Sequence, residues 1–304
     1  MKKQIGLFII FLYIVNIISA QEMISLWPEG KMPNSKGMIL NDSIAKDRLY
    51  QVGSPRVYSF LAPKEKNTGA AILIVPGGGY VRLTADYKNV SAALFYQKMG
   101  INAFVVCHRL PTSPDLITPH IAPLQDIQRA MRIIHSNAEK WKIDPKCIGI
   151  SGTSAGGHGA STLGTHPEDV SAIGDDLDKF PYKPAFMILV SPVISFKNSI
   201  AHKGSRDRLI GKDAPKELIE AYSNEIRVTK ETPTTLLIHA DDDGSVSPLN
   251  SVVFYEALRK AKVSSSLHIF PQGGHRLGTK TNPGSADMWP TLSIEWLKEM
   301  KFIE

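Results

Sequence analysis

Residues 147–160 read CIGISGTSAGGHGA and join an apolar run to a glycine-rich turn with a serine at its apex. That serine, Ser154, is the centre of the pattern G-x-S-x-G, which is typical of a strand that turns sharply into a helix and exposes a nucleophilic hydroxyl. Residues two before and two after the serine lie against each other across such a turn, so Gly152 and Gly156 provide the small side chains that fit there. Because an ordinary glycine-rich loop has a similar composition, the rest of the chain decides between the two interpretations.

Apolar runs alternate with helical patterns along the chain, and the runs are of the length expected for strands buried on both faces. Strands are predicted at 57–61, 70–75, 101–107, 147–151, 185–191, 234–240 and 265–270. Helices are predicted at about 85–99, 124–141, 155–164, 215–224, 248–261 and 289–300. This alternation indicates an α/β fold with a mostly parallel sheet and helices on both faces.

The segments outside these runs show how the chain is organised. Residues 23–40 are rich in turn-forming residues and are interpreted as a lead-in rather than a domain. Residues 192–232 interrupt the alternation with a long polar stretch, which we expect to be a lid insertion over the catalytic face. The sequence therefore predicts one α/β domain over residues 21–304.

The bulk composition is that of an ordinary globular protein, with 304 residues, 43% hydrophobic and 21% charged. The formal net charge is +6, or +4 without Lys2 and Lys3. The excess is spread along the chain without a basic run, which indicates solvated surface rather than a nucleic-acid partner.

The first twenty residues have the features of a secretory signal peptide. Lys2 and Lys3 form a positive start, residues 5–18 are almost wholly apolar, and Ser19 and Ala20 offer a cleavage site. The apolar core is short for a membrane span, which needs ~20 apolar residues. We expect residues 1–20 to be removed, leaving a secreted or periplasmic protein without a membrane attachment, and N-terminal sequencing near Gln21 tests this.

The chain contains two cysteines, and no disulfide is expected between them. Cys107 closes one predicted strand and Cys147 opens another. In a parallel sheet these positions lie toward opposite ends, beyond the reach of a disulfide.

A serine nucleophile needs a base, and the base needs an acid that fixes its tautomer. The order Ser, then Asp or Glu, then His suits an elbow of this kind. His275 lies on a glycine-rich loop after the last predicted strand, and the aspartates Asp241, Asp242 and Asp243 follow the strand at 234–240. Asp243 is predicted as the acid because it stands three residues before Val246, which anchors the turn into the next helix.

Two other histidines are interpreted as structural. His158 lies one turn along the helix that follows Ser154, with its side chain tied to that helix, and His239 lies within a buried strand. Asp241 and Asp242 are expected to cap and solvate the acid turn.

The oxyanion hole needs backbone N–H donors. Ala155, directly after the nucleophile, supplies one, and Gly78 and Gly79 of the run at 76–80 (PGGGY) are expected to supply the others. A phosphate-binding loop is the alternative, but the pattern lacks both G-x-G-x-x-G and a Lys-Ser/Thr pair. No His, Cys or Asp cluster has metal-ligand spacing, so neither a metal nor an organic cofactor is expected.

Five stretches together resemble a known family. They are 76–80 (PGGGY), 123–130 (PLQDIQRA), 154–158 (SAGGH), the Asp243 turn and 273–275 (GGH). The chain from Trp27 onward is similar to bacterial α/β-hydrolase esterases of the acetylxylan-esterase type. This resemblance implies the α/β-hydrolase fold, the catalytic residues Ser154, Asp243 and His275, and an oxyanion hole at Gly78, Gly79 and Ala155.

Two positions depart from the family pattern. Thr153 stands where the family usually has an aromatic residue, and Ser247 delays the proline that usually follows a valine after the acid. The first departure is expected to change packing beside the nucleophile, and the second to change the local turn.

The resemblance implies a secreted serine esterase that removes acetyl or other small acyl groups from acylated carbohydrates through an acyl-enzyme. A serine peptidase of the same fold is one alternative, although no large gating domain precedes the hydrolase unit. A non-catalytic binding protein is another. The loop at 111–123 and the predicted lid are expected to shape the substrate pocket.

Overall fold

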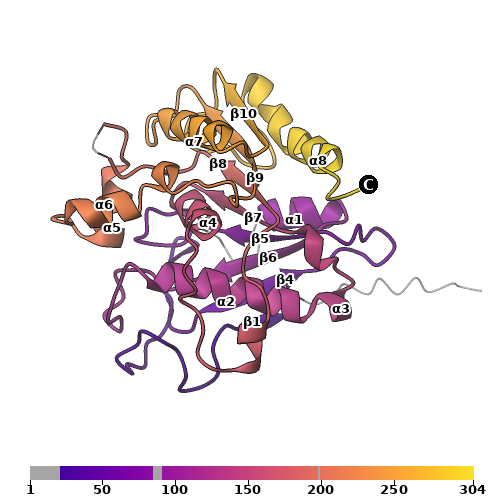
Figure 1. Ribbon diagram of the computed structural model, residues 1–304. Coiled ribbons are helices and arrows are strands. Elements are labelled where there is room, and N and C mark those ends of the chain that lie inside the picture. The colour runs from indigo at the N-terminus through magenta and orange to yellow at the C-terminus, as the bar shows by residue number, and fades with distance from the viewer. Residues whose placement is uncertain (1–20, 85–90, 198) are drawn as a thin grey trace, which may run out of the picture.

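An eight-stranded sheet runs through the molecule, and the computed structural model describes residues 21–84, 91–197 and 199–304 (Figure 1). Across the sheet the strands are β1 (Met23–Ser25), β4 (Arg56–Phe60), β6 (Asn102–Cys107), β5 (Ala71–Val75), β7 (Ile148–Thr153), β8 (Phe186–Val190), β9 (Thr234–Ala240) and β10 (Ser265–Phe270). The predicted signal peptide, residues 1–20, lies outside the described residues, as do residues 85–90.

The sheet is mostly parallel, as predicted. Strands β6, β5, β7, β8, β9 and β10 pair in parallel, whereas β4 pairs antiparallel with β6 and β1 pairs antiparallel with β4. Strand β1 and the hairpin of β2 (Ser43–Ala45) and β3 (Arg48–Gln51) were not predicted. Strands of three or four residues are too short for a recognisable alternation of apolar and polar residues.

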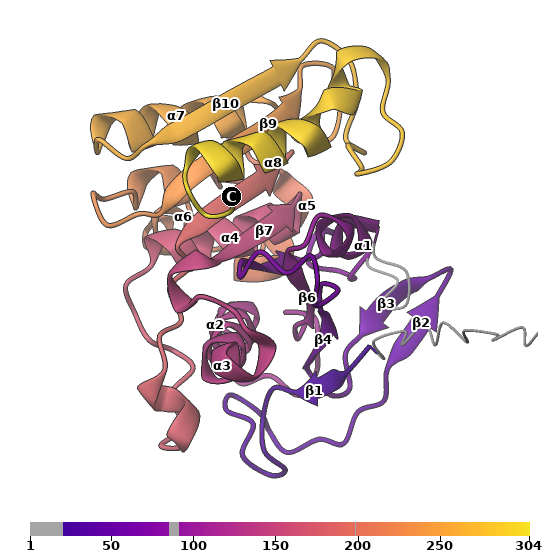
Figure 2. The same cartoon turned by 90° about the vertical axis from the view of Figure 1, so that its right-hand side faces the viewer.

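Helices cover both faces of the sheet (Figure 2). Helices α1 (Ser91–Lys98) and α8 (Trp289–Glu299) pack on one face, and α2 (Ala122–Ser136), α4 (Ala155–Thr165) and α7 (Leu249–Lys260) pack on the other. Successive strand residues point to opposite faces. Ile72 and Ile74 of β5 therefore join the core under α1 and α8, and Leu73 joins the core under α2 and α4.

The helix predicted at 124–141 is two helices in the structure. Helix α2 ends at Ser136, and α3 (Ala138–Trp141) follows after Asn137. The Asn137 side chain donates a hydrogen bond to the Ile133 carbonyl at 2.9 Å, which competes with the helical backbone. Helix α2 also begins earlier than predicted, because Pro123 is accommodated in its first turn.

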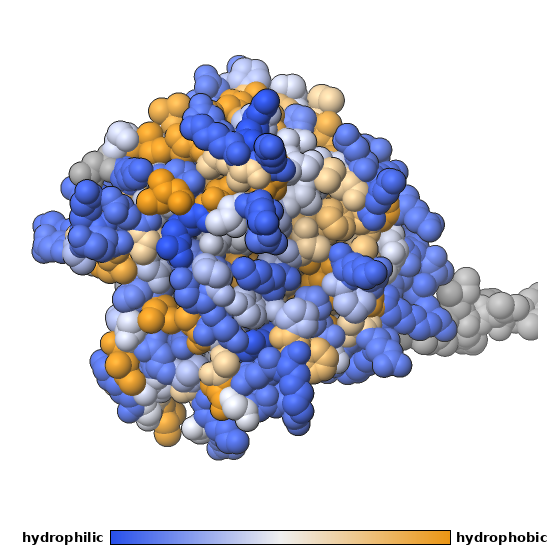
Figure 3. All heavy atoms as spheres, in the orientation of Figure 1, coloured by the Kyte–Doolittle hydropathy of each residue, from blue (hydrophilic) through white to orange (hydrophobic). Residues whose placement is uncertain are grey.

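The polar stretch at 192–232 contains α5 (Lys203–Ile210), α6 (Lys216–Ala221) and a 3₁₀ turn at Asn224–Ile226. Helix α5 was not predicted, because its sequence KGSRDRLI has few apolar residues. Side chains over α5 and α6, at the left of Figure 3, are mostly hydrophilic. Other 3₁₀ turns lie at Pro145–Cys147, Asp176–Lys179 and Gly284–Met288.

The strand order reverses next to β5. The chain runs from β5 to β6 on one side and then returns past β5 to β7 on the other. In open parallel sheets, the carboxyl ends of strands at such a reversal are where ligands bind. The glycine run at 77–79 follows β5 and Ser154 follows β7, so the topology places both at this point.

Cys107 and Cys147 are both free, as predicted. Among the described residues, no helix combines the length and apolar character needed to cross a membrane.

Candidate active site

Ser154 occupies a strained turn between β7 and α4. Its backbone has φ 58° and ψ −124°, a region that side-chain-bearing residues seldom adopt. The turn is held by hydrogen bonds on both sides: the Ser154 N–H donates to the Val190 carbonyl at 3.2 Å, and the Ser154 carbonyl accepts from Val193 at 3.0 Å. The hydroxyl therefore has a fixed position at the carboxyl edge of the sheet.

The glycines around Ser154 are required by close backbone contacts. A Cβ at Gly152 would lie 2.2 Å from the Gly156 carbonyl oxygen, and one at Gly156 would lie 2.1 Å from the Val75 carbonyl oxygen. Real Cβ atoms do not approach backbone atoms this closely. The predicted reason for the G-x-S-x-G spacing is thus confirmed, and the second contact ties the start of α4 to β5.

The three residues predicted as nucleophile, base and acid come together. His275 Nε2 lies 2.9 Å from Ser154 Oγ, and His275 Nδ1 lies 2.7 Å from Asp243 Oδ2. Since a carboxylate only accepts, the imidazole proton is on Nδ1, which leaves Nε2 to accept the serine proton. The Asp243 side chain has no exposed surface, whereas 24% of the His275 side chain is exposed toward the cavity.

Four donors surround the Asp243 carboxylate. Oδ1 accepts hydrogen bonds from the N–H groups of Ser245 and Val246, both at 2.9 Å. His239 Nε2 lies 3.2 Å from Oδ2, in addition to the contact from His275. Burial alone would raise the pKa of Asp243, but the hydrogen bonds from His239, His275, Val246 and Ser245 hold that pKa well below its usual range. The carboxylate therefore stays ionised.

His239 is the buried core histidine that the sequence indicated, with no exposed surface. Its Nδ1 contacts Ser251 Oγ at 2.8 Å and its Nε2 contacts the Val246 carbonyl at 3.1 Å. The sequence did not predict its position beside Asp243, although it stands four residues before that aspartate, near the end of β9.

The other two aspartates of the turn have different surroundings from Asp243. Asp242 accepts a hydrogen bond from the Gly274 N–H at 2.7 Å, and Asp241 is exposed.

The glycine run after β5 folds back on itself beside Ser154. Thr84 bonds the Gly77 carbonyl through both its N–H and its hydroxyl, at 3.0 and 3.1 Å. Gly78 has φ 134°, and a Cβ there would meet the Arg82 carbonyl oxygen at 2.0 Å, so only glycine fits. Among the described residues, the N–H groups of Gly78, Gly79 and Ala155 have no hydrogen-bond acceptor. They are therefore available to a ligand, and Ala155 has the added field of the α4 N-terminus.

His158 lies beneath the site with no exposed surface. Its ring stacks on Phe196 with centroids 4.3 Å apart, while Nδ1 contacts the Tyr80 hydroxyl and Nε2 the Tyr222 carbonyl, both at 2.9 Å. Burial lowers the pKa of His158 to about 3. Its predicted structural role is confirmed, since it links α4 to the segment that carries α5 and α6.

A cavity of about 670 Å³ opens in front of Ser154 and His275. The glycines of the run at 77–79 form one wall, and His202 and Arg208 of the predicted lid segment form another. His202 Nδ1 accepts from the Ser205 N–H at 3.2 Å, so the neutral ring carries its proton on Nε2. Burial, together with nearby positive charge, lowers the pKa of His202, which favours this neutral form.

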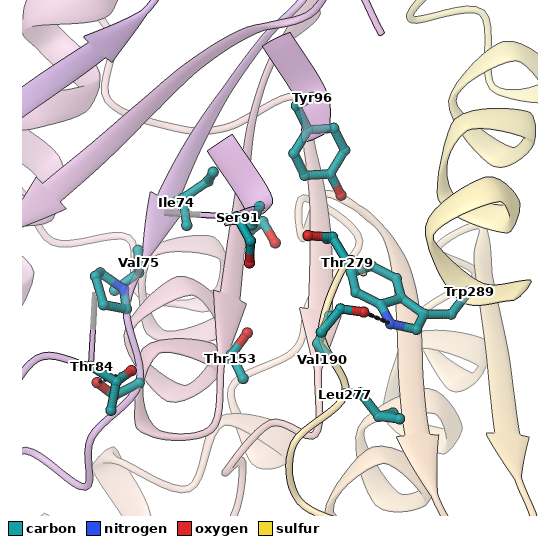
Figure 4. Close-up of a pocket in the computed structure, with 15 residues that line it drawn as sticks. Ile74, Val75, Thr84, Ser91, Tyr96, Thr153, Val190, Leu277, Thr279 and Trp289 are labelled. Carbon is teal, nitrogen blue, oxygen red and sulfur yellow. Dashed lines mark hydrogen bonds between the residues drawn. The ribbon is translucent and has the colours of Figure 1, made fainter. Parts of the chain in front are cut away.

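A second cavity of about 290 Å³ adjoins the first beside Thr153 (Figure 4). The two share four lining residues, which are Gly77, Thr84, Thr153 and Leu277. In Figure 4 the hydroxyls of Thr153, Ser91 and Thr279 point toward the same open space. A larger side chain at position 153 would enter this space.

Comparison with known proteins connects this geometry to a family. The family described as BD-FAE matches residues 59–258, from the end of β4 to the last turns of α7. The chain belongs to the BD-FAE family. The match covers the elbow, the glycine run and the Asp243 turn, while His275 lies beyond it.

Relatives of this BD-FAE member include two curated proteins. An acetylxylan esterase of Xylanibacter ruminicola is 35% identical over 233 residues, covering 75% of this chain and 45% of that protein. The endo-1,4-beta-xylanase B of Butyrivibrio fibrisolvens is 34% identical over 207 residues, covering 68% and 32%. The chain therefore spans less than half the length of either relative.

Solved structures show the same α/β-hydrolase fold. The acetyl ester-xyloside bifunctional hydrolase of Caldicellulosiruptor lactoaceticus is 33% identical with a TM-score of 0.79, covering 93% of this chain and 97% of that one. The carboxylesterase Cest-2923 of Lactobacillus plantarum, at 21% identity and a TM-score of 0.65, covers 88% and 99% and shares the fold. The predicted fold class and family resemblance are thus confirmed.

Proposed function

We propose that this protein is a serine esterase that removes acetyl or other small acyl groups from polysaccharides. The observation that carries the proposal is the position of His275 between Ser154 Oγ, at 2.9 Å, and Asp243 Oδ2, at 2.7 Å. This is the geometry needed to take a proton from a serine and return it. The names of the similar acetylxylan esterase and acetyl ester-xyloside hydrolase support a carbohydrate ester as substrate.

In the proposed reaction, Ser154 Oγ attacks the ester carbonyl carbon while His275 Nε2 takes the hydroxyl proton. The carbonyl oxygen becomes negative and is stabilised by the N–H groups of Ala155, Gly78 and Gly79. The carbon–oxygen bond to the sugar then breaks, and His275 returns its proton to the sugar oxygen. A water molecule, deprotonated by His275, then attacks the acyl-Ser154 ester, and His275 returns that proton to Ser154 Oγ as the bond to the serine breaks and the carboxylic acid is released.

The two cavities suit an ester with a large alcohol part and a small acyl part. The open cavity of about 670 Å³ has room for sugar units, and the His202 Nε2–H is a donor at its wall. The adjoining cavity of about 290 Å³ behind Thr153 has room for acyl groups larger than acetyl. We also propose that residues 1–20 direct export, which would bring the enzyme to extracellular or periplasmic glycans.

Acetate release from acetylated xylo-oligosaccharides tests the proposal. Ser154→Ala removes the nucleophile and is expected to lower kcat by roughly 10³-fold or more. Ser54→Ala, which changes an exposed serine after β3, serves as the matched control and should keep wild-type kcat. Equal rates for wild type and Ser154→Ala would rule the mechanism out.

Two rival functions give different results in the same experiment. A peptidase would cleave peptide substrates faster than acetyl esters. A non-catalytic binding protein would leave both intact and would not react with a fluorophosphonate probe at Ser154.

A further inference from the structure

Arginine side chains from four separate parts of the chain line the cavity in front of Ser154. They come from β3, from the glycine loop after β5, from α5 and from the residue after His275: Arg48, Arg82, Arg208 and Arg276. Among the described residues, no aspartate or glutamate lines this cavity. The nearest catalytic carboxylate, Asp243, is shielded behind His275 and has no exposed surface. The cavity therefore has a strong excess of positive charge.

These arginines differ from most others in the chain. Six of the eleven arginines form ion pairs with carboxylates, as Arg109 does with Asp126 at 2.8 Å. Within the described parts of the chain, none of the four cavity arginines has an ion pair. Arg82 Nε is buried without a hydrogen-bond partner, and Arg208 donates to the Gly204 carbonyl at 3.0 Å. Much of their donor capacity is therefore unused.

Unpaired positive charges around a concave surface focus the electrostatic field into it and attract anions. A guanidinium presents its N–H donors as a planar fork that matches the two oxygens of a carboxylate. The imidazole of His202, which also lines the cavity, carries no negative charge in either protonation state and so does not offset the arginines. A cavity lined by these donors is therefore suited to an anionic group, such as a carboxylate, beside the ester.

We infer that the cavity binds acylated saccharides that carry a carboxylate near the ester, as a uronic acid residue does. The inference rests on the proposed esterase function and specifies its substrate class. Arg208 and Arg276 are exposed at the cavity wall, where they meet the approaching substrate, whereas Arg82 lies partly buried beside Gly78. The same charges disfavour saccharides with cationic substituents.

Two synthetic substrates that differ in a single group test the inference. One is an acetylated xylotetraose with one glucuronic acid branch, and the other carries glucose in place of glucuronic acid. At low ionic strength, kcat/KM for acetate release is expected to be at least about tenfold higher for the acidic substrate, the size of one charged hydrogen bond. Added NaCl should reduce this preference, because salt screens exposed charges.

Variants locate the preference in the cavity. The double variant R208Q/R276Q is expected to bring the ratio of kcat/KM values close to one, and R208K/R276K to retain part of the preference. R259Q changes an exposed arginine in the last turn of α7, outside the cavity, and should keep the wild-type ratio. Should the double variant fold poorly, R276Q alone alters one exposed side chain and should lower the ratio.

The outcomes separate the inference from the function on which it rests. Equal kcat/KM for the two substrates with wild type, or an unchanged ratio in R208Q/R276Q, would overturn the inference while leaving the esterase in place. Failure of wild type to hydrolyse either substrate, or a simple aryl acetate, would overturn the proposed function itself.

Discussion

The hydrogen bonds around Asp243 keep its carboxylate in the ionised form. Both carboxylate oxygens are occupied, Oδ1 by the N–H groups of Ser245 and Val246 and Oδ2 by His275 and His239. Because every partner is a donor, removing the negative charge would leave several hydrogen bonds weakened. The buried carboxylate is therefore well suited to orient the His275 ring and to stabilise the imidazolium that the proposed reaction would form.

Asp243→Asn should test this role at the residue scale. The amide of asparagine can present its NH₂ group to His275 Nδ1, which would move the imidazole proton to Nε2 and leave no acceptor for the Ser154 proton. We expect kcat to fall by roughly 10³–10⁴-fold.

Asp241→Asn is the matched control, because Asp241 is an exposed aspartate of the same turn. Steady-state rates on an aryl acetate should be close to wild type for this control. A similar loss in both variants would indicate that the turn, rather than the Asp243 charge, is needed.

The element that organises the site is the turn from β7 into α4. Its glycines permit contacts that join three pieces of backbone: β5, β7 and the first turn of α4. The Gly156 contact with Val75 also fixes the distance between the elbow and the glycine run that follows β5. A side chain at this position would therefore disturb both Ser154 and the proposed oxyanion donors.

Gly156→Ala is expected to lower the free energy of unfolding by about 1–3 kcal/mol, because backbone atoms have to move to accommodate the new methyl group. Activity should fall with it, since the elbow moves relative to residues 77–79. Chemical denaturation compares the variant with Gly244→Ala, whose new Cβ meets nothing within 4 Å. Equal stability of the two variants would contradict the packing argument.

At the scale of the whole molecule, buried neutral histidines make folding sensitive to acid. Burial lowers the pKa of His158 to about 3 and the pKa values of His135 and His166 to about 4. In the unfolded chain these groups take up protons near pH 6.5. Between about pH 6.5 and 4 the unfolded state therefore binds more protons, so stability is complete above pH 6.5 and is lost as the pH falls.

The free energy of unfolding, measured by urea titration, should fall between pH 7 and pH 5. His158, which is fully buried, contributes a slope of about 1.4 kcal/mol per pH unit in the window between its two pKa values. His158→Gln can keep a donor for the Tyr222 carbonyl and an acceptor for the Tyr80 hydroxyl, and it should reduce the slope by about that amount. An identical slope in the variant would show that His158 is not the group that titrates.

Local pattern and chain order were enough to predict the core of this protein. The apolar runs predicted the central strands, because a strand buried on both faces must be apolar throughout. The G-x-S-x-G turn, the Asp243 turn and His275 could be placed because the carboxyl ends of parallel strands meet at one edge, wherever those strands stand in the chain. The structure brings these three residues within hydrogen-bonding distance, and their catalytic roles stay predictions.

The features that only the tertiary structure decided depend on contacts between segments that lie far apart in the chain. The short strand β1 and the β2–β3 hairpin have no periodic signal in the sequence. The hairpin nevertheless brings Arg48, which stands more than a hundred residues before Ser154 in the chain, to the cavity in front of that serine. Likewise, Arg82, Arg208 and Arg276 are single charges among many in the sequence. Only the fold brings them to one cavity, and among the described residues only the fold distinguishes them from the arginines that form ion pairs. The hydrophobic core leaves a pattern in the sequence because each buried strand must contribute a run of apolar residues. A cavity wall leaves no such pattern, because it is assembled from isolated residues whose neighbours are set by the fold.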